Sequence, residues 1–298
     1  MRVTTNSLSE TLIRQIQQLS SQQSKLQTQV ATGQRISQPE DDPAAMGRVL
    51  NFESEQRQVG QYLSNTNRAL ELSQASFAGL QQMKKVSDRA TEIGTLGTGV
   101  IGADAARAYA SELDQLIEHT LQLGNSKLRN DYLYSGTAVD TAPFSAQRDA
   151  QGKVTSVAYQ GNAATSSVQL SESASVAPGT TGATNLGLRD FINQLVALRD
   201  ALNASDPTGI KSAQTSLLAN EDRLVSALAE NGGVQSRIEA NRSQQQDRAG
   251  NLASLVSGET DTDMASTIVR LNQTQNAYQA ALQSTASIMR ISLLDYIK

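Results

Sequence analysis

Residues 264–289 read MASTIVRLNQTQNAYQAALQSTASIM, and apolar side chains recur among them in alternating steps of four and three residues. The stripe with this spacing comprises Met264, Ile268, Leu271, Gln275, Tyr278, Leu282, Thr285 and Met289. Steps of three and four keep side chains on one face of an α-helix. The spacing therefore predicts a long amphipathic helix with a narrow seam, of the kind that packs against another helix.

The other end of the chain carries a similar stripe. Its members are Leu8, Leu12, Ile16, Leu19, Leu26 and Val30, with Gln23 standing where an apolar residue would continue the series. This pattern predicts a helix from residue 8 to about 32, and Gly33 supplies a natural helix stop. Because both ends carry a narrow seam, we expect the intervening chain to bring them together as an antiparallel helix pair.

The two terminal stretches also carry little charge. Residues 1–38 hold only five charged side chains, and apolar residues of the last stretch also lie off its main stripe, at Val269, Ala280, Ala281, Ile288, Ile291, Leu293 and Leu294. A helix pair with few charges and apolar residues on more than one face has surface left to bury. Packing between molecules is therefore favoured, with a closed hairpin inside one molecule as the alternative.

The middle of the chain is helical on both sides of a different segment. Helical patterns cover residues 43–93 and 104–129, resume at 185, and continue from 207 to about 256, where Gly232-Gly233 marks either a loop or an interruption. Residues 132–183 are rich in Gly, Ser, Thr and Val, and short alternation at 154–159 and 167–170 predicts strands. The expected fold is mainly α, a long antiparallel bundle or coiled coil from both termini with a small β-rich inserted domain.

This pattern divides the chain into three expected domains. Residues 1–40 and 258–298 form a terminal coiled-coil assembly domain, residues 41–135 and 185–257 a helical body, and residues 136–184 a β-rich insert. Truncation of a surface loop within 145–182 is expected to matter little.

Composition excludes several classes of function. The net charge of −4 and the pI near 5.2 argue against a nucleic-acid-binding protein, which needs a basic face. The chain has no cysteine, so disulfide bonds play no part. We expect no membrane insertion, because no stretch approaches the roughly 20 apolar residues of a membrane span, and the first residues lack the apolar run of a cleaved signal peptide.

The residue types that usually carry chemistry are explained better by local structure. His119 is the only histidine and falls within an expected helix, so a packing or surface position is favoured over catalysis. Asp41-Asp42 precedes Pro43, and Asp261, Thr262 or Asp263 can cap the helix that begins near Met264, since such side chains cap helix N-termini. With no convergent polar cluster visible, we expect no enzyme, no metal site and no cofactor.

Several motifs resemble those of one protein family. The stretch GQRISQPEDDPA at 33–44 is similar to the turn after the first helix of bacterial flagellins and their relatives, and its DDPA form resembles the hook-associated branch of that family. Further similar segments are YSGT at 134–137 with TAPF at 141–144, DTDMA at 261–265, NAYQAAL at 276–282 and ISLLDYI at 291–297. The resemblance covers about 1–145 and 185–298.

The resemblance implies a structural junction protein of the bacterial flagellum, which joins a hook-side ring to the flagellin filament. Its partners would be further copies of itself, the adjoining hook-associated junction protein, flagellin and a flagellar export chaperone. It would be extracellular, exported through the type III apparatus without a cleaved signal peptide. Filament flagellin is the alternative, and a cytosolic coiled-coil interaction protein is a more distant one.

The resemblance and the stripes together give a set of candidate residues. The expected assembly interface comprises Leu12, Ile16, Leu19, Leu26, Val30, Met264, Ile268, Leu271, Tyr278, Leu282, Ile288, Ile291 and Leu294. The expected interdomain linker and helix cap comprises Arg35, Asp41, Asp42 and Pro43.

Overall fold

A computed structural model describes residues 2–99 and 102–296, with side-chain surroundings described within 10–288. The chain forms two compact units. The terminal unit contains Met1–Gln58 and Ala249–Lys298, and the central unit contains Val59–Arg248. The mainly α fold with a small β-rich insert that the sequence predicts is confirmed, whereas the three-domain division stays a prediction.

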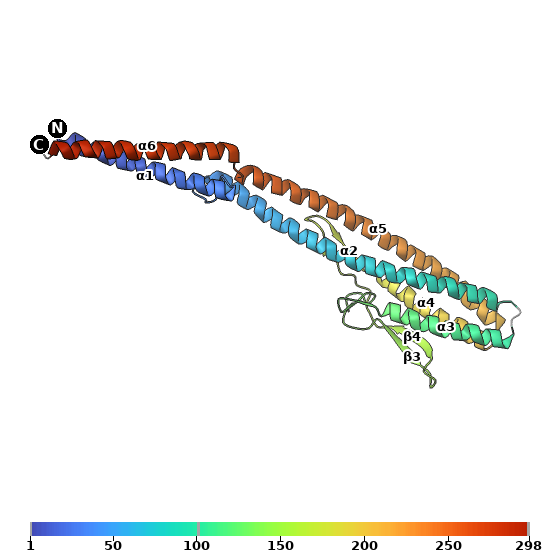
Figure 1. The fold of residues 1–298 in the computed structure, drawn as a ribbon. Helices are drawn as coiled ribbons and strands as arrows, with labels where there is room; N and C mark the ends of the chain where they lie inside the picture. The colour runs from blue at the N-terminus through green and yellow to red at the C-terminus, as the bar shows by residue number, and fades with distance from the viewer. Residues whose placement is uncertain (1, 100–101, 297–298) are drawn as a thin grey trace. The chain divides into compact units, whose positions relative to one another are not determined.

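Long helices make up most of both units (Figure 1). The helices are α1 (Arg2–Thr32), α2 (Pro43–Gly97), α3 (Ala103–Gly124), α4 (Gly182–Asn203), α5 (Pro207–Thr260) and α6 (Met264–Tyr296). The strands are β1 (Lys127–Leu128), β2 (Asp131–Tyr132), β3 (Phe144–Arg148), β4 (Val154–Tyr159), β5 (Val168–Gln169) and β6 (Ser175–Val176). The strands pair in order as three antiparallel hairpins, β1 with β2, β3 with β4 and β5 with β6.

Several helix boundaries follow from local chemistry. Gly33 ends α1 with a φ of 72°, in the left-handed region where a glycine is favoured. Thr181 caps α4 by accepting a hydrogen bond from the Thr184 N–H, and Asp263 caps α6 by accepting one from the Ala265 N–H at 3.1 Å.

Other boundaries differ from those the sequence predicts. α1 begins at Arg2 rather than residue 8, and α5 runs through Gly232-Gly233 without interruption. The helix expected to reach residue 129 ends at Gly124, and Phe144 packs where a side chain at residue 124 would lie. Asn125 holds Phe144 there through its side chain, which donates to the Phe144 C=O and accepts from its N–H.

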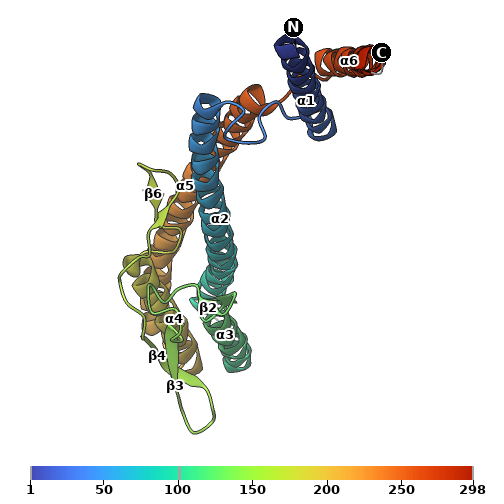
Figure 2. The ribbon, with the colours of Figure 1, turned by 90° about the vertical axis from the view of Figure 1, so that its left-hand side faces the viewer.

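The core of the central unit joins α2, α3, α4 and α5 to the insert. Its fully buried side chains include Leu80, Met83, Leu113, Ile117, Tyr134, Phe191, Ile192 and Leu195. β4 packs along α4, as Figure 2 shows, and Asn193 of α4 binds both the N–H and the C=O of Val157. The four-helix region therefore depends on the insert for part of its packing.

The insert also reaches a second apolar cluster. Leu170 and Val176, beside strands β5 and β6, are buried with Leu70 of α2 and Ile238 of α5. The expectation that truncating a surface loop within 145–182 matters much less than changing the terminal helices stays a prediction, and it does not extend to Leu170 and Val176, because these side chains are buried in this cluster.

Candidate assembly interface

The terminal unit is built on the pairing of α1 with α6, which lie side by side (Figure 1). Along α1 the side chains shielded from solvent repeat with helical periodicity, and their neighbours are exposed. They are Leu12, Ile16, Leu19, Gln23, Leu26 and Val30, of which Leu26 is the most buried at 8% exposure. The stripe predicted on α1 is thus the face that α1 turns towards α6.

On α6 the shielded face differs from the most apolar one. The shielded side chains recur in steps of four and three, and comprise Thr267, Leu271, Thr274, Tyr278, Ala281, Thr285 and Ile288. Threonine and alanine occupy much of this face, and such small side chains let two helix backbones approach closely. Leu271, Tyr278 and Ile288 from the expected interface lie here.

Three further apolar residues of the stripe predicted on α6 are turned to solvent. Met264 is 40% exposed, Ile268 43% and Leu282 43%. These side chains lie on a face next to the one that contacts α1. Ile291 and Leu294 fall on the last turns of α6, and their side chains lie outside the described residues.

In the terminal unit, the link between α1 and α2 is hydrogen-bonded to the link between α5 and α6. The Arg35 N–H donates to the Thr260 C=O at 2.6 Å, and the Thr262 N–H donates to the Gly33 C=O at 2.9 Å. The Arg35 guanidinium also donates to the Glu259 C=O at 2.8 Å. The α1–α2 link is thereby fastened to the α5–α6 link by backbone bonds that do not depend on side-chain packing.

Carboxylates order the same segment. Asp42 Oδ1 accepts the Ala45 N–H at 3.0 Å, and Pro43 occupies the first position of α2, where its missing N–H costs nothing. Asp41 accepts the N–H groups of Ser37 and Gln38 and forms an ion pair with Lys25 at 2.7 Å. Asp41 and Asp42 therefore serve as local caps for the link and for α2.

These contacts shift the ionisation of the carboxyl groups. The Lys25 ammonium and two backbone N–H groups hold the pKa of Asp41 well below its usual range. Arg48 binds Glu259 through two hydrogen bonds at 2.8 and 2.9 Å, which lowers the pKa of Glu259 and raises that of Arg48. Since these pairs are partly exposed, each contributes modestly to stability and mainly fixes geometry.

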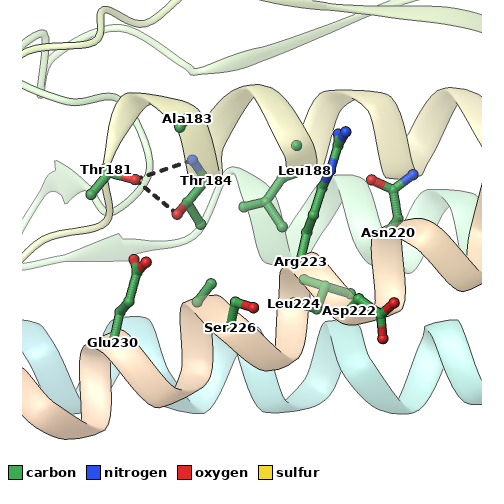
Figure 3. A pocket seen from close by; sticks show the side chains of 12 residues that line it. Thr181, Ala183, Thr184, Leu188, Asn220, Asp222, Arg223, Leu224, Ser226 and Glu230 are labelled. Atoms are coloured by element: carbon green, nitrogen blue, oxygen red, sulfur yellow. Dashed lines mark hydrogen bonds between the residues drawn. The ribbon is translucent and has the colours of Figure 1, made fainter.

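The central unit has a hollow of its own between α4 and α5 (Figure 3). It measures about 450 Å³, and Leu188 and Leu224 contribute apolar side chains to its wall. Some of its polar groups have local partners, because Thr181 caps α4, Arg223 approaches Asp190 at 3.9 Å and the Asn220 side-chain N–H donates to Gln194, but the buried Oδ1 of Asn220 has no hydrogen-bond partner among the described residues. The arrangement is that of a groove between packed helices.

The remaining features of interest are the histidine, possible metal ligands and possible membrane-spanning helices. His119 is an exposed residue of α3. Within 2–99 and 102–296, no group of three or more His, Cys, Asp or Glu side chains has an arrangement that could hold a metal ion. In the same ranges, no helix is both long and apolar enough to cross a membrane.

Two long-range contacts in the structure could not have been predicted from the sequence pattern alone. Glu259 meets Arg48 and Arg35 across more than 200 residues of chain. Tyr134 is fully buried, and its hydroxyl donates to the Ser76 C=O at 2.9 Å, beside Gly79, where a methyl group would collide with the hydroxyl oxygen. Tyr134 belongs to the YSGT segment, so the family resemblance marked the position without explaining it.

The sequence of this chain matches known proteins along its whole length. The model for the bacterial flagellin N-terminal helical region matches residues 3–138. Flagellar hook-associated protein 3 of Escherichia coli K12 is 25% identical over 325 aligned residues, which cover all of both chains.

Solved structures share the fold. A putative flagellar hook-associated protein of Vibrio parahaemolyticus aligns with a TM-score of 0.66 at 18% identity, over 74% of this chain and 100% of that one. The flagellar junction protein FlgL of Legionella pneumophila aligns with a TM-score of 0.54 at 11% identity, over 72% and 100%. Together with the paired terminal helices, the Asp-capped link and the β-rich insert, these comparisons show that the chain resembles flagellar hook-associated protein 3 along its whole length, as its sequence motifs indicate.

Proposed function

We propose that this protein is a structural junction protein of the bacterial flagellum, which joins the hook-side junction ring to the flagellin filament. In this proposal α1 and α6 do the joining, by packing against the terminal helices of neighbouring subunits. One observation carries it: α6 buries threonines against α1 while Met264, Ile268 and Leu282 stay 40–43% exposed. A helix that shows solvent its larger apolar side chains has a face left for a partner.

The energetics favour assembly through these helices. Fully burying a side chain such as Leu, Ile or Met contributes about 1.5–3 kcal/mol, so covering the remaining exposed part of each contributes on the order of 1 kcal/mol. Narrow-seamed helices also gain most of their stability from tertiary partners rather than from helix propensity. Contacts repeated around a closed array of identical subunits would add up to a stable joint.

The proposal names the partners that such a joint requires. Its immediate neighbours are further copies of itself, the adjoining hook-associated junction protein on one side and flagellin on the other. Before assembly an export chaperone covers the terminal helices, and the chain leaves the cell unfolded through the flagellar type III channel without a cleaved signal peptide. The charge-poor helices support this, because they would be prone to associate wherever they are left uncovered.

The test is complementation of a bacterium that lacks its own junction protein, with immunogold labelling of isolated flagella. We expect gold at the hook–filament boundary and restored swimming. Gold along the filament would instead indicate a filament flagellin, and protein retained in the cytosol would contradict both export and assembly.

A matched pair of variants tests whether α6 does the joining. Leu282→Asp places a charge on the exposed apolar face and should abolish incorporation while the secreted monomer stays soluble. Ala280→Asp places the same charge on another exposed face of α6 and should be incorporated normally. Equal incorporation of the two variants would contradict the proposed interface.

A further inference from the structure

The hollow between α4 and α5 contains a buried hydrogen-bond acceptor that the chain itself leaves unsatisfied. Asn220 lines this α4–α5 hollow and is only 2% exposed, and its side-chain Oδ1 has no hydrogen-bond partner among the described residues. The amide nitrogen of the same side chain donates to the Gln194 side chain and to the Ser216 C=O, which fixes the orientation of the amide. Figure 3 shows the oxygen directed along α5, towards Leu188 and Arg223. Because a buried acceptor without a partner costs free energy, a ligand that brings a donor would be stabilised here.

A carboxylate lies across the same hollow. Glu230 extends from α5 towards Thr181 at the start of α4 (Figure 3), and no residue within the described side-chain range 10–288 forms an ion pair or hydrogen bond with its carboxylate. The hydroxyl groups of Thr181 and Thr184 bond to each other at 2.9 Å, so they are already engaged. The hydrogen-bonding capacity left open in the hollow is therefore mainly that of acceptors, and it suits a ligand that supplies donors.

The charges that line the hollow favour a cationic ligand. Asp222 and Glu230 contribute two negative charges and Arg223 one positive charge, which leaves a net charge of −1. Arg223 lies 3.9 Å from Asp190. It is seven residues from Glu230, which is about 10 Å along the helix. Because exposed charges this far apart are largely screened, Glu230 remains open to a cation from outside the chain.

The shape of the hollow suits a short peptide. Leu188 of α4 and Leu224 and Ala227 of α5 supply apolar wall to a volume of about 450 Å³. A second hollow of about 240 Å³ shares Ala227 and Glu230 with it, so there is room on both sides of Glu230. Asn220 and Glu230 stand ten residues apart on α5, which is about 15 Å. An extended peptide covers this distance with about four or five residues, at about 3.3 Å for each.

We propose that the α4–α5 hollow binds a short, extended, basic peptide segment of a partner protein. A backbone N–H of the segment donates to Asn220 Oδ1, an apolar side chain packs on Leu188 and Leu224, and a lysine or arginine about four residues further along reaches Glu230. The stem of such a basic side chain suits the apolar wall while its charged head binds the carboxylate. A metal ion or a small amine is a poorer occupant, because it cannot reach two acceptors about 15 Å apart. The inference goes beyond the proposed function, since it concerns the central unit and not the terminal helices.

Titration of the full-length protein with peptides tests the inference. The probe is acetyl-Leu-Ala-Ala-Ala-Lys-amide, and the backbone amide signals of the isotope-labelled protein are followed by two-dimensional NMR. We expect saturable shifts confined to residues 181–188 and 220–231. The same peptide with norleucine in place of lysine keeps the apolar stem without the charge, so it should bind about threefold more weakly. A peptide with glutamate at that position should bind more weakly still.

Variants of the hollow test each proposed contact. Glu230→Gln removes the charge, so it should weaken binding of the lysine peptide about threefold and leave binding of the norleucine peptide unchanged. Asn220→Leu removes the unsatisfied acceptor and should weaken binding of both peptides by about the same factor. Glu239→Gln changes an exposed carboxylate of α5 that lines neither hollow, and this control should bind both peptides as the wild type does.

Three results would overturn the inference. They are an absence of saturable shifts in the wild type, equal binding of the lysine and norleucine peptides, and equal binding of the lysine peptide to the wild type and to Glu230→Gln. If circular dichroism shows that Asn220→Leu fails to fold, the comparison of Glu230→Gln with Glu239→Gln decides the question. Each of these results leaves the proposed function intact, because that function is tested by the location of the wild-type protein in flagella.

Discussion

The central unit and helix α6 of the terminal unit are both helical, yet they differ in how they treat large apolar side chains. In the central unit Phe191, Leu195 and Tyr134 are completely buried. In the terminal unit the buried side chains of α6 within 264–288 are Thr267 and Thr274, at 5% and 7% exposure, while Ile268 and Leu282 remain open to solvent. The central unit thus buries its largest apolar side chains, whereas α6 leaves large apolar side chains exposed, although Ile36, Val49 and Leu252 are buried elsewhere in the terminal unit.

This difference explains how one chain can fold stably and still bind other subunits. Burial of large apolar side chains dominates the stability of a folded domain. A unit that keeps them exposed is less stable alone and gains from every partner that covers them. Variants that change one unit at a time test whether the two units differ in this way.

The largest effect is expected from removing α6. Deletion of residues 264–298 should abolish incorporation into flagella completely, because both the seam for α1 and the exposed stripe are lost. The central unit should keep its helical circular dichroism and its cooperative thermal transition. As a control, deletion of the exposed hairpin tip 150–152 should leave incorporation unchanged. Collapse of the whole protein on removal of α6 would contradict the separation of the two units.

Phe191→Ala should have the largest effect on the central unit. Phe191 is fully buried, so its truncation should lower the free energy of unfolding by about 3–5 kcal/mol, from lost burial and the cavity left behind. Urea unfolding followed by circular dichroism measures the change. Leu186→Ala on the same helix, at a site 39% exposed, should cost under about 0.5 kcal/mol. Similar losses from both variants would argue against a compact core here.

Leu170→Ala tests whether the insert supports the helices. Leu170 is 1% exposed and packs in the cluster with Leu70 and Ile238, so we expect a loss of about 2–3 kcal/mol in the free energy of unfolding. Glu172→Ala changes an exposed neighbour and should have no measurable effect. If Leu170→Ala left the free energy of unfolding unchanged, the insert would be a dispensable surface feature.

The smallest expected effect is the pH dependence of the terminal unit. Folding lowers the pKa values of Asp41, Asp42 and Glu259, so their stabilising contribution is fully present above the unfolded values near pH 4 and is lost as pH falls through the lower folded values. Thermal unfolding should therefore shift to lower temperature between pH 5 and pH 2. Glu259→Gln removes one of these groups and should weaken that dependence. An unchanged pH profile in the variant would mean that Glu259 contributes nothing to it.

The resemblance to hook-associated protein 3 and the fold class predicted from the sequence are confirmed. Local signals also placed the stop at Gly33, the Asp42 cap with Pro43 and the 154–159 strand, because each depends on residues close together in the chain. The end of α3 was mispredicted, since the helix stops at Gly124, where it contacts Phe144, a residue twenty positions later in the chain. The residues of the assembly interface stay a prediction, since their partners are other chains.

What the sequence determined by itself was the set of helices, their caps and the presence of a narrow apolar stripe at each end, since these follow from spacing and from hydrogen bonds within a turn or two. Only the tertiary structure decided which face of α6 meets α1. Leu271 and Tyr278 belong to both of its possible seams, so periodicity alone permits either one. Close packing selected the seam completed by Thr267, Thr274 and Ala281, because small side chains admit α1, and it left Ile268 and Leu282 outside.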